Sequence, residues 1–336
     1  MLSKRSAGSR ARGIYNDREP NSTTDVTTPS GPYRPRLTWQ HLHPRHAGGW
    51  LLLALFGLCA FLPFWLTRPA GAALGRLMLA GNRKRRDIVR VNLALCFPDR
   101  SEAEREQMLR RHYTVSGQAY LDLGLLVFAP AWRVLTAVRL DGLEHYQAPL
   151  REGRPVILLV PHTMGMNFTG ALLAAEHPMF GLIKPVADPV MDWLLQRGRM
   201  RFGCVLYLKN FGLRQVVRAL KDRNTFYYLP DEDHGPRHSL FAPFFGVPTA
   251  TLNTLGRLAD MAGAAVVPCF TRLTARGYEL RFEPALENFP TGDDQRDAET
   301  MNRVLEQGLR DMPEQYMWTF KLFKTRPGGV RSPYAR

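Results

Sequence analysis

The chain has 336 residues, of which 45% are hydrophobic, so it can form one large domain or two small ones with a substantial core. Its 45 Lys and Arg outnumber its 30 Asp and Glu, and the formal net charge of +15 predicts an anionic partner. The candidates are nucleic acid, an anionic membrane surface, a phosphorylated lipid and an acidic carrier protein. The 4 cysteines stand far apart, which gives no sign of a disulfide framework or zinc site and favours a reducing cytosolic setting.

The amino-terminal part of the chain predicts a leader followed by a membrane anchor. Residues 1–46 are rich in Ser, Thr, Gly, Pro and Arg without apolar periodicity, which indicates a disordered basic leader. Residues 47–67 carry no charge and are long enough to cross roughly 30 Å of hydrocarbon. A buried amphipathic helix is the alternative, but the segment is apolar on all sides. We therefore predict a membrane anchor at 47–67, spanning or deeply embedded, and a membrane partner in place of nucleic acid.

Basic residues follow the anchor directly. Near an anionic leaflet each basic residue contributes about 1 kcal/mol to membrane binding. A solvated, charged helix face is the alternative, and it is the commoner structure for such a cluster. We expect residues 68–150 to form a helical membrane-proximal region, with 92–98 as a connector ending at a proline. Within it, Ser101 to Glu104 match a capping box that begins a helix running toward Leu126. The basic residues are Arg68, Arg76, Arg83, Lys84, Arg85, Arg86 and Arg90.

Strands and helices alternate in residues 151–330. This pattern predicts an α/β domain with a mainly parallel or mixed sheet flanked by helices. The expected strands are Val156–Val160, Cys204–Leu208, Thr225–Leu229, Ala265–Phe270 and Tyr278–Phe282. The expected helices include Val190–Arg201, Gly212–Asp222, Thr249–Ala262 and Asp297–Met312.

His162 follows the first expected strand, at the edge where open α/β sheets place their chemistry. A structural histidine is the alternative. A carboxylate at position 167 would suit a general base, yet the chain has Asn167 there. The sequence contains no Gly-x-Ser-x-Gly, Gly-x-Gly-x-x-Gly or phosphate-loop motif, which disfavours serine hydrolase, dinucleotide-binding and nucleotide-binding functions.

Four blocks of the chain carry a resemblance to a known family. They are 86–93 with 97–98, 183–201, the Pro-Asp-x-Asp-x-Gly-Pro-Arg motif at 230–237, and the segment 313–327 with Pro-Glu-Gln-Tyr-x-Trp and Phe-Lys-Thr-Arg-Pro. Together they resemble the late acyltransferases of lipid A biosynthesis, the lauroyl/myristoyl transferase family. The resemblance implies transfer of a fatty acyl chain from acyl carrier protein to a hydroxyl of an anionic lipid. It also implies a single amino-terminal anchor and the cytoplasmic face of a bacterial inner membrane. We expect no cofactor and no metal.

The resemblance also suggests roles for individual residues. His162 would act as general base on the acceptor hydroxyl, a role worth about 10²–10⁴-fold in rate, with no covalent acyl-enzyme. Arg199 would bind a lipid phosphate or developing charge, unless it is solvated on a helix surface. Asp231 and Asp233 fall near the expected cleft; a metal site is conceivable, but a structural turn is favoured. The expected substrate-binding residues are Lys184, Arg199, Asp231, Asp233 and Arg237.

The chain departs from the family pattern beside His162. The family carries Asp or Glu where this chain has Asn167, and commonly Asn-Pro where it has Asp188-Pro189. We hypothesise an exchange in which Asp188 supplies the catalytic negative charge from across the cleft. Asp188→Asn would then abolish activity, whereas Asn167→Asp would be tolerated. The alternative is that Asp188 caps the helix starting near Val190.

A second departure lies near the carboxy terminus, where Phe320-Lys321-Leu322 replaces the family's usual His-Arg-Arg and predicts altered acceptor binding. The sequence thus predicts a membrane-anchored acyltransferase that takes acyl carrier protein thioesters and a lipid A precursor. Two alternatives stay open. One is acylation of another lipid, such as a lysophospholipid or an amino-acid lipid, and the other is an impaired paralogue that binds lipid or carrier protein without turnover.

Overall fold

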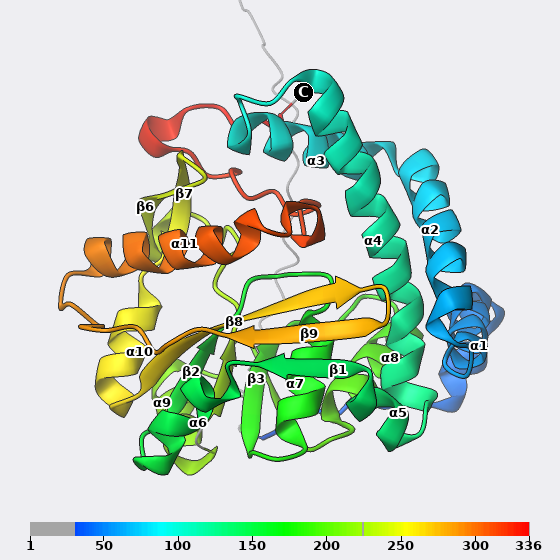
Figure 1. The fold of residues 1–336 in the computed structure, drawn as a ribbon, viewed down its shortest axis with the longest axis horizontal. Helices are drawn as coiled ribbons and strands as arrows, with labels where there is room; N and C mark the ends of the chain where they lie inside the picture. The colour runs from blue at the N-terminus through cyan, green and yellow to red at the C-terminus, as the bar shows by residue number, and fades with distance from the viewer. Residues whose placement is uncertain (1–30, 224, 336) are drawn as a thin grey trace, which may run out of the picture.

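A seven-stranded sheet forms the centre of the molecule in the computed structural model, which describes residues 31–223 and 225–335. Its strand order is β1-β9-β8-β2-β5-β3-β4 (Figure 1). β8 and β9 pair antiparallel and all other neighbours pair parallel, which confirms the predicted mainly parallel or mixed sheet. The strands are β1 (Val138–Asp141), β2 (Val156–Leu159), β3 (Met179–Ile183), β4 (Val205–Leu208), β5 (Thr225–Tyr228), β8 (Ala265–Thr274) and β9 (Gly277–Phe282). A separate antiparallel pair consists of β6 (Ser239–Phe244) and β7 (Val247–Leu252).

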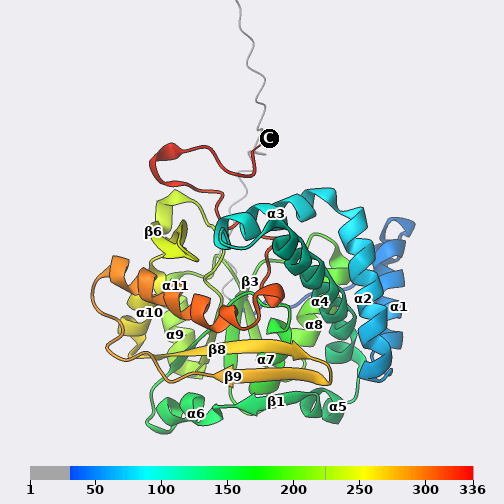
Figure 2. The same ribbon diagram turned by 45° about the horizontal axis from the view of Figure 1, so that its top comes forward.

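Helices cover both faces of this sheet, as a parallel sheet requires. Successive side chains of a strand point to opposite faces, and all four residues of β2 are buried. Ile157 and Leu159 belong to the core with α9 (Leu213–Arg223), α10 (Thr254–Ala262) and α11 (Asp294–Arg310). Val156 and Leu158 belong to the core with α6 (Leu143–Arg151) and α7 (Met166–Ala174). Figure 2 shows α11 and α6 on opposite sides of β8 and β9.

The amino-terminal helices stand beside the sheet, and they correct the prediction for residues 47–67. The apolar segment is divided into α1 (Ala47–Cys59) and α2 (Phe64–Gly81), because Pro63 cannot continue a helix and instead becomes the N-cap of α2. The membrane helix predicted here is therefore unsupported. Within the described ranges, every helix falls short of the length or apolar content that crossing a bilayer demands.

Three further helices lie in the range 68–150 that was expected to be helical, namely α3 (Arg83–Cys96), α4 (Glu102–Phe128) and α5 (Ala131–Thr136), but the same range also contains strand β1 of the central sheet and most of α6. The capping box of Ser101 and Glu104 at the start of α4 is confirmed. The connector predicted at 92–98 is wrong for 92–96, which belong to α3, and only 97–98 follow the helix. The Asn92 amide donates to the carbonyls of Trp318 (2.7 Å) and Phe320 (2.8 Å), so this polar residue joins the helix to the carboxy-terminal segment.

Glycines allow α2 and α4 to cross in close contact (Figure 1). A Cβ placed on Gly75 would lie 2.1 Å from the carbonyl oxygen of Tyr113, and one on Gly117 would lie 2.1 Å from that of Gly71. Backbone approach of this kind excludes any larger residue. A Cβ on Gly124 would likewise lie 1.9 Å from the carbonyl oxygen of Phe56 in α1.

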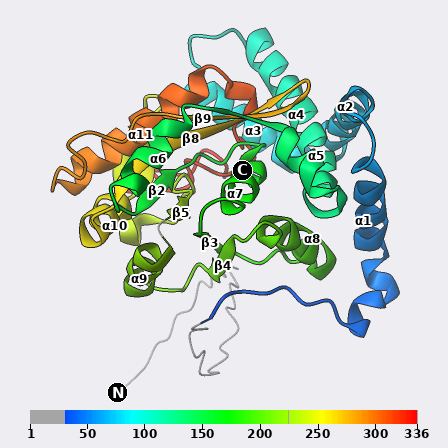
Figure 3. The ribbon, with the colours of Figure 1, turned by 60° about the horizontal axis from the view of Figure 1, so that its bottom comes forward.

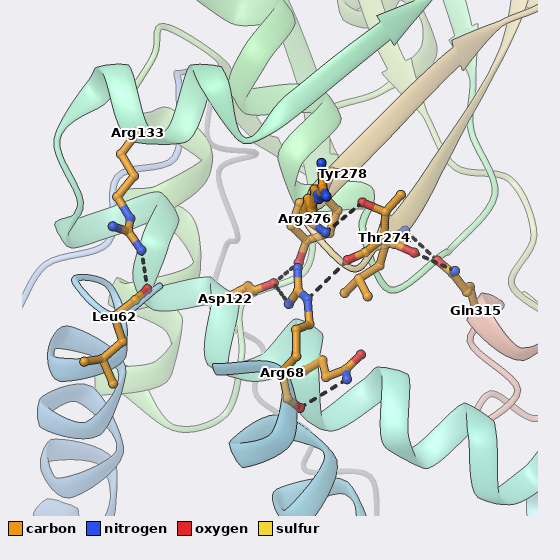
Figure 4. Close-up of polar contacts among 10 residues, drawn as sticks. Leu62, Arg68, Asp122, Arg133, Thr274, Arg276, Tyr278 and Gln315 are labelled. Atoms are coloured by element: carbon orange, nitrogen blue, oxygen red, sulfur yellow. Dashed lines mark hydrogen bonds and ion pairs between the residues drawn. The ribbon is translucent and has the colours of Figure 1, made fainter. Parts of the chain in front are cut away.

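A buried ion pair fastens α2 to the rest of the fold (Figure 4). Arg68 Nη1 lies 2.6 Å from Asp122 Oδ2 in α4, with side chains only 11% and 4% exposed. Arg68 Nε also donates to the carbonyl of Thr274 (3.2 Å), and Tyr278 of β9 donates to the same Asp122 oxygen (2.6 Å). One arginine thus connects α2 to α4 and to the end of β8.

The other predicted elements agree with the structure except at one helix. The five expected strands and three of the four expected helices are confirmed within a few residues. The fourth helix is expected at Thr249–Ala262, but β7 occupies its first part and α10 begins only at Thr254. The leader prediction for residues 1–30 lies outside the described residues. In 31–46, two short 3₁₀ helices (Trp39–Leu42 and Pro44–His46) form, and the Tyr33 backbone donates to Leu206 at the edge of β4 (2.7 Å).

Candidate active site

The pairing of β2 with β5 places a histidine beside a carboxylate. The two strands run parallel, and Leu159 lies opposite Tyr228 at the ends of both. His162 and Asp231 lie equally far beyond this pair along their own chains. Since parallel strands end at the same edge of a sheet, both side chains reach the same point.

His162 and Asp231 make two hydrogen bonds to each other. The Nδ1 of the imidazole lies 2.6 Å from Asp231 Oδ1, and the backbone N–H of His162 donates to Oδ2 at 2.8 Å. The two side chains are 12% and 5% exposed. Burial opposes ionisation of Asp231, but the charge and hydrogen bonds of His162 hold the pKa of this carboxyl below its ordinary value. An ionised partner fixes a proton on Nδ1 and leaves Nε2 free to accept one.

The carboxy-terminal segment closes over this pair. Thr163 forms a β-bridge with Tyr316, and the backbone N–H of Met317 donates to the carbonyl of His162 (2.9 Å). The Phe320 ring stands edge-on to the imidazole with centroids 5.0 Å apart. Burial, and then the nearby Asp231, raise the pKa of the Tyr316 phenol well above its ordinary value, so it stays neutral beside the acid. These contacts hold the imidazole in one orientation.

A second carboxylate faces the opposite side of the imidazole. Glu232 Oε1 lies 3.7 Å from His162 Nε2, and its other oxygen lies 2.7 Å from Nζ of Lys209, just beyond β4. Burial acts to raise the pKa of Glu232, but the Lys209 hydrogen bond and His162 keep it below its ordinary value. The imidazole therefore lies between two ionised acids.

Asp233 has a structural role in the same loop. Its Oδ1 accepts hydrogen bonds from the Gly235 backbone (2.9 Å) and the Thr325 hydroxyl (2.8 Å), and its Oδ2 accepts one from the Thr325 backbone (2.6 Å). The favoured prediction of a structural turn thus describes Asp233, which ties the loop to the carboxy-terminal segment. It does not describe Asp231, whose oxygens are both directed at His162.

Asn167 contacts an arginine. It lies in the first turn of α7, and its side-chain oxygen accepts a hydrogen bond from Arg199 Nε (2.8 Å). Arg199 is on α8 (Pro189–Met200), and its Nη1 donates to Gln196 Oε1 (3.2 Å). Burial lowers the pKa of this guanidinium. Arg199 is therefore a partly buried cation that donates to two neutral amides.

Asp188 makes the contacts of a helix cap. Its Oδ1 accepts hydrogen bonds from the backbones of Val190 (3.0 Å) and Met191 (2.9 Å), and its Oδ2 lies 3.7 Å from His46 Nδ1. Within the described residues its hydrogen bonds and ion pair all lie at this helix end, and none reaches His162. The capping alternative therefore accounts for Asp188. The carboxylate beside His162 comes from Asp231 instead.

Two expected substrate-binding residues lie apart from this pair. Lys184 follows β3 and is exposed, and Arg237 is exposed in the 3₁₀ helix Pro236–His238. Sequence reasoning missed the functional contacts of Glu232, Lys209 and Tyr316. The equal spacing of His162 and Asp231 from their strands is the available signal, but it becomes meaningful only once β2 and β5 are known to be neighbours.

An imidazole with an ionised acid on Nδ1, at the carboxyl edge of an α/β sheet, is a geometry suited to taking a proton from a hydroxyl or water. The comparisons with known proteins identify the kind of enzyme. The chain belongs to the bacterial lipid A biosynthesis acyltransferase family, which it matches over residues 34–325, and it is an acyltransferase. This confirms the family expected from the sequence.

Curated relatives cover most of the chain. It is 34% identical over 303 residues to the lipid A biosynthesis lauroyltransferase of Escherichia coli K12, an alignment that covers 89% of this chain and 99% of that protein. The lipid A biosynthesis myristoyltransferase of the same organism is 34% identical over 307 residues, covering 90% and 95%. A lipid A biosynthesis acyltransferase of Haemophilus influenzae is 32% identical over 300 residues, covering 88% and 94%.

Proposed function

We propose that this protein transfers a fatty acyl chain from an acyl carrier protein thioester to a hydroxyl of a lipid A precursor, with His162 as general base. Nε2 takes the proton as the acceptor O–H bond breaks, and the oxygen forms a bond to the thioester carbon. The carbon–sulfur bond then breaks, and the proton held by the imidazolium passes to the carrier's thiolate, which restores the neutral ring. A direct attack needs no covalent acyl-enzyme.

The observation that carries this proposal is the 2.6 Å contact between His162 and Asp231. An imidazole becomes positively charged when it accepts a proton, and a buried carboxylate stabilises that charge. Asp231 therefore supplies the function that the amide of Asn167 cannot. This contact argues for a working enzyme and against an impaired paralogue.

Arg199 is suited to an anion in this reaction. The Arg199 guanidinium donates to Asn167 and Gln196, and neither of these amides neutralises its positive charge. We propose that it binds a phosphate of the acceptor or stabilises the charge that develops on the thioester oxygen. The exposed Lys184 and Arg237 would bind the anionic acceptor more weakly, since their charges are solvated.

We also propose that the outer surface of α1 and α2 contacts the membrane, at the cytoplasmic face of a bacterial inner membrane. Figure 3 shows α1 at the periphery of the molecule, away from the sheet. Its exposed apolar side chains continue through the turn after it and onto α2, and exposed apolar side chains gathered in this way mark a membrane or partner contact. They are Leu51, Leu52, Leu55, Leu58, Phe61, Trp65, Leu66 and Leu77. Arg76 and Arg83–Arg85 extend this surface with positive charge that suits anionic headgroups.

Membrane contact can be tested by flotation with vesicles containing anionic phospholipid. Leu51→Glu with Trp65→Glu should abolish flotation. Met261→Glu is the matched control, because it replaces an exposed apolar residue on α10, remote from α1 (Figure 1). Equal flotation of both variants would contradict the proposed membrane surface.

The acyl transfer is tested with membranes that contain the protein, acyl carrier protein thioesters and a tetra-acylated disaccharide acceptor, with the lipid product weighed by mass spectrometry. One added acyl chain that is lost in His162→Ala supports the proposal. Acylation of a lysophospholipid or amino-acid lipid in its place would reassign the acceptor. Retained carrier binding without any product would establish the impaired paralogue.

A further inference from the structure

Glu232 and Lys209 form an ion pair at the side of His162 that faces the reaction. Nε2 is the nitrogen that receives the proton in the proposed function, and Glu232 Oε1 lies 3.7 Å from it. The Glu232 and Lys209 side chains are 31% and 43% exposed, whereas Asp231 is 5% exposed. The second acid is therefore open to substrate, and the first is closed off behind the ring.

The geometry points to Glu232 as a positioning residue for the acyl transfer, with Lys209 setting the strength of its effect on His162. This inference rests on the proposed function and adds two residues to it. A carboxylate this close to Nε2 stabilises the imidazolium that forms when the acceptor loses its proton. An ammonium 2.7 Å from the same carboxylate cancels much of that stabilisation.

The pairing of the Glu232 carboxylate with the Lys209 ammonium can be explained by the requirements of the reaction. Two uncompensated carboxylates beside one imidazole would keep it protonated, and a protonated imidazole cannot act as a base. They would also repel an anionic acceptor. Lys209 offsets the charge of the second carboxylate, so that the ring can be unprotonated when the acceptor binds. Glu232 then stabilises the imidazolium that forms when the proton is transferred.

Other charged and titratable groups around the ring do not reproduce this arrangement. Asp231 holds Nδ1, and the Tyr316 phenol is neutral beside it. His234 is close enough to interact with His162, Glu232, Asp233 and Lys209, and desolvation, followed by Lys209, lowers its pKa, which disfavours its charged form. Arg85 is directed at the carbonyl of Thr319 (2.9 Å). Glu232 and Lys209 are thus the pair that acts on Nε2.

The test is the pH dependence of acyl transfer in the full-length protein. Glu232→Gln should move the acidic limb of the profile to lower pH by about one unit, because the imidazolium loses a stabilising charge. Lys209→Met should move it to higher pH, because the carboxylate is no longer offset. Glu287→Gln and Lys221→Met are exposed matched controls on other elements and should leave the limb in place.

A second measurement does not depend on turnover. The ¹³C resonance of the labelled His162 imidazole, identified by its loss in His162→Ala, should titrate at shifted pH in the same two directions. If the titration pH of His162 stays unchanged in both variants, or moves in the same direction in both, the proposed role of Glu232 and Lys209 is overturned. The proposed function is contradicted by a different result, namely a His162→Ala variant that still transfers the acyl chain.

Discussion

Replacement of Asp231 by asparagine is the sharpest test of the proposed chemistry. The change removes one negative charge and keeps the side-chain shape. Asp231 Oδ1 lies 2.6 Å from Nδ1, so the charges on the carboxylate and the imidazolium centre are about 4 Å apart, worth about 4 kcal/mol at an effective dielectric of about 20. At about 1.4 kcal/mol per tenfold, the rate of acyl transfer should fall about 10³-fold.

The amide adds a second effect in the same direction. An asparagine NH₂ can donate to Nδ1, which would place the ring proton on Nε2 and leave no base facing the acceptor. The same aspartate-to-asparagine change in a serine protease triad costs about 10⁴-fold, so the combined loss here should be about 10³–10⁴-fold. The backbone hydrogen bond from His162 can be kept by the amide oxygen, so the fold should survive.

The assay compares initial rates of acyl transfer from carrier protein thioester to lipid acceptor. Asp222→Asn is the control, because Asp222 is exposed on α9, away from the site. Circular dichroism checks that the variants are folded. A folded Asp231→Asn enzyme with a rate within about tenfold of the wild type, alongside an inactive His162→Ala, would refute the reasoning.

Three further predictions follow from the hydrogen bonds and ion pairs of individual side chains. The folded-state pKa of Asp231 lies below its unfolded value of about 3.9, so its carboxylate stabilises the folded protein above that pH, and this stabilisation is lost on further acidification. In acid titrations of unfolding, Asp231→Asn should therefore lose less stability than the wild type. Arg68→Met should cost about 3–5 kcal/mol in urea denaturation by stranding Asp122, and Arg68→Met with Asp122→Leu should recover much of it. In acyl-transfer assays Asn167→Asp should be tolerated, and Asp188→Asn should retain activity while lowering stability by about 1 kcal/mol; an inactive Asp188→Asn enzyme would restore the exchange hypothesis.

The sequence is most informative where local patterns decide the structure. The apolar residues of β2 and the capping box at Ser101 can be recognised because apolar runs and capping act over a few residues. The division of residues 47–67 between α1 and α2 is not predicted, because the segment is judged by its continuous apolar content. Pro63, where the division occurs, is present within the segment. The strand β7 falls within a predicted helix, because its partner β6 lies in a part of the chain with no strand assigned from sequence.

The candidate site can be predicted only in part. The place of His162 after a strand identifies it, but Asn167 and Asp188, the residues that the sequence pattern pairs with it, are not its partners. The actual partner comes from a neighbouring strand, and strand order is a long-range property that one sequence does not reveal. Glu232 and Lys209 are beyond prediction for the same reason, because β4 and β5 are not adjacent and only the loops beyond their ends meet.

The glycine crossing of α2 over α4 has a consequence for catalysis at a lipid surface. With backbones in contact at Gly75 and Gly117, α2 packs directly on α4. If the outer surface of α1 and α2 contacts the leaflet as proposed, this packing relates the depth of its leucines and tryptophan to the position of the imidazole. The acceptor hydroxyl of a lipid would then have to reach the imidazole from that depth.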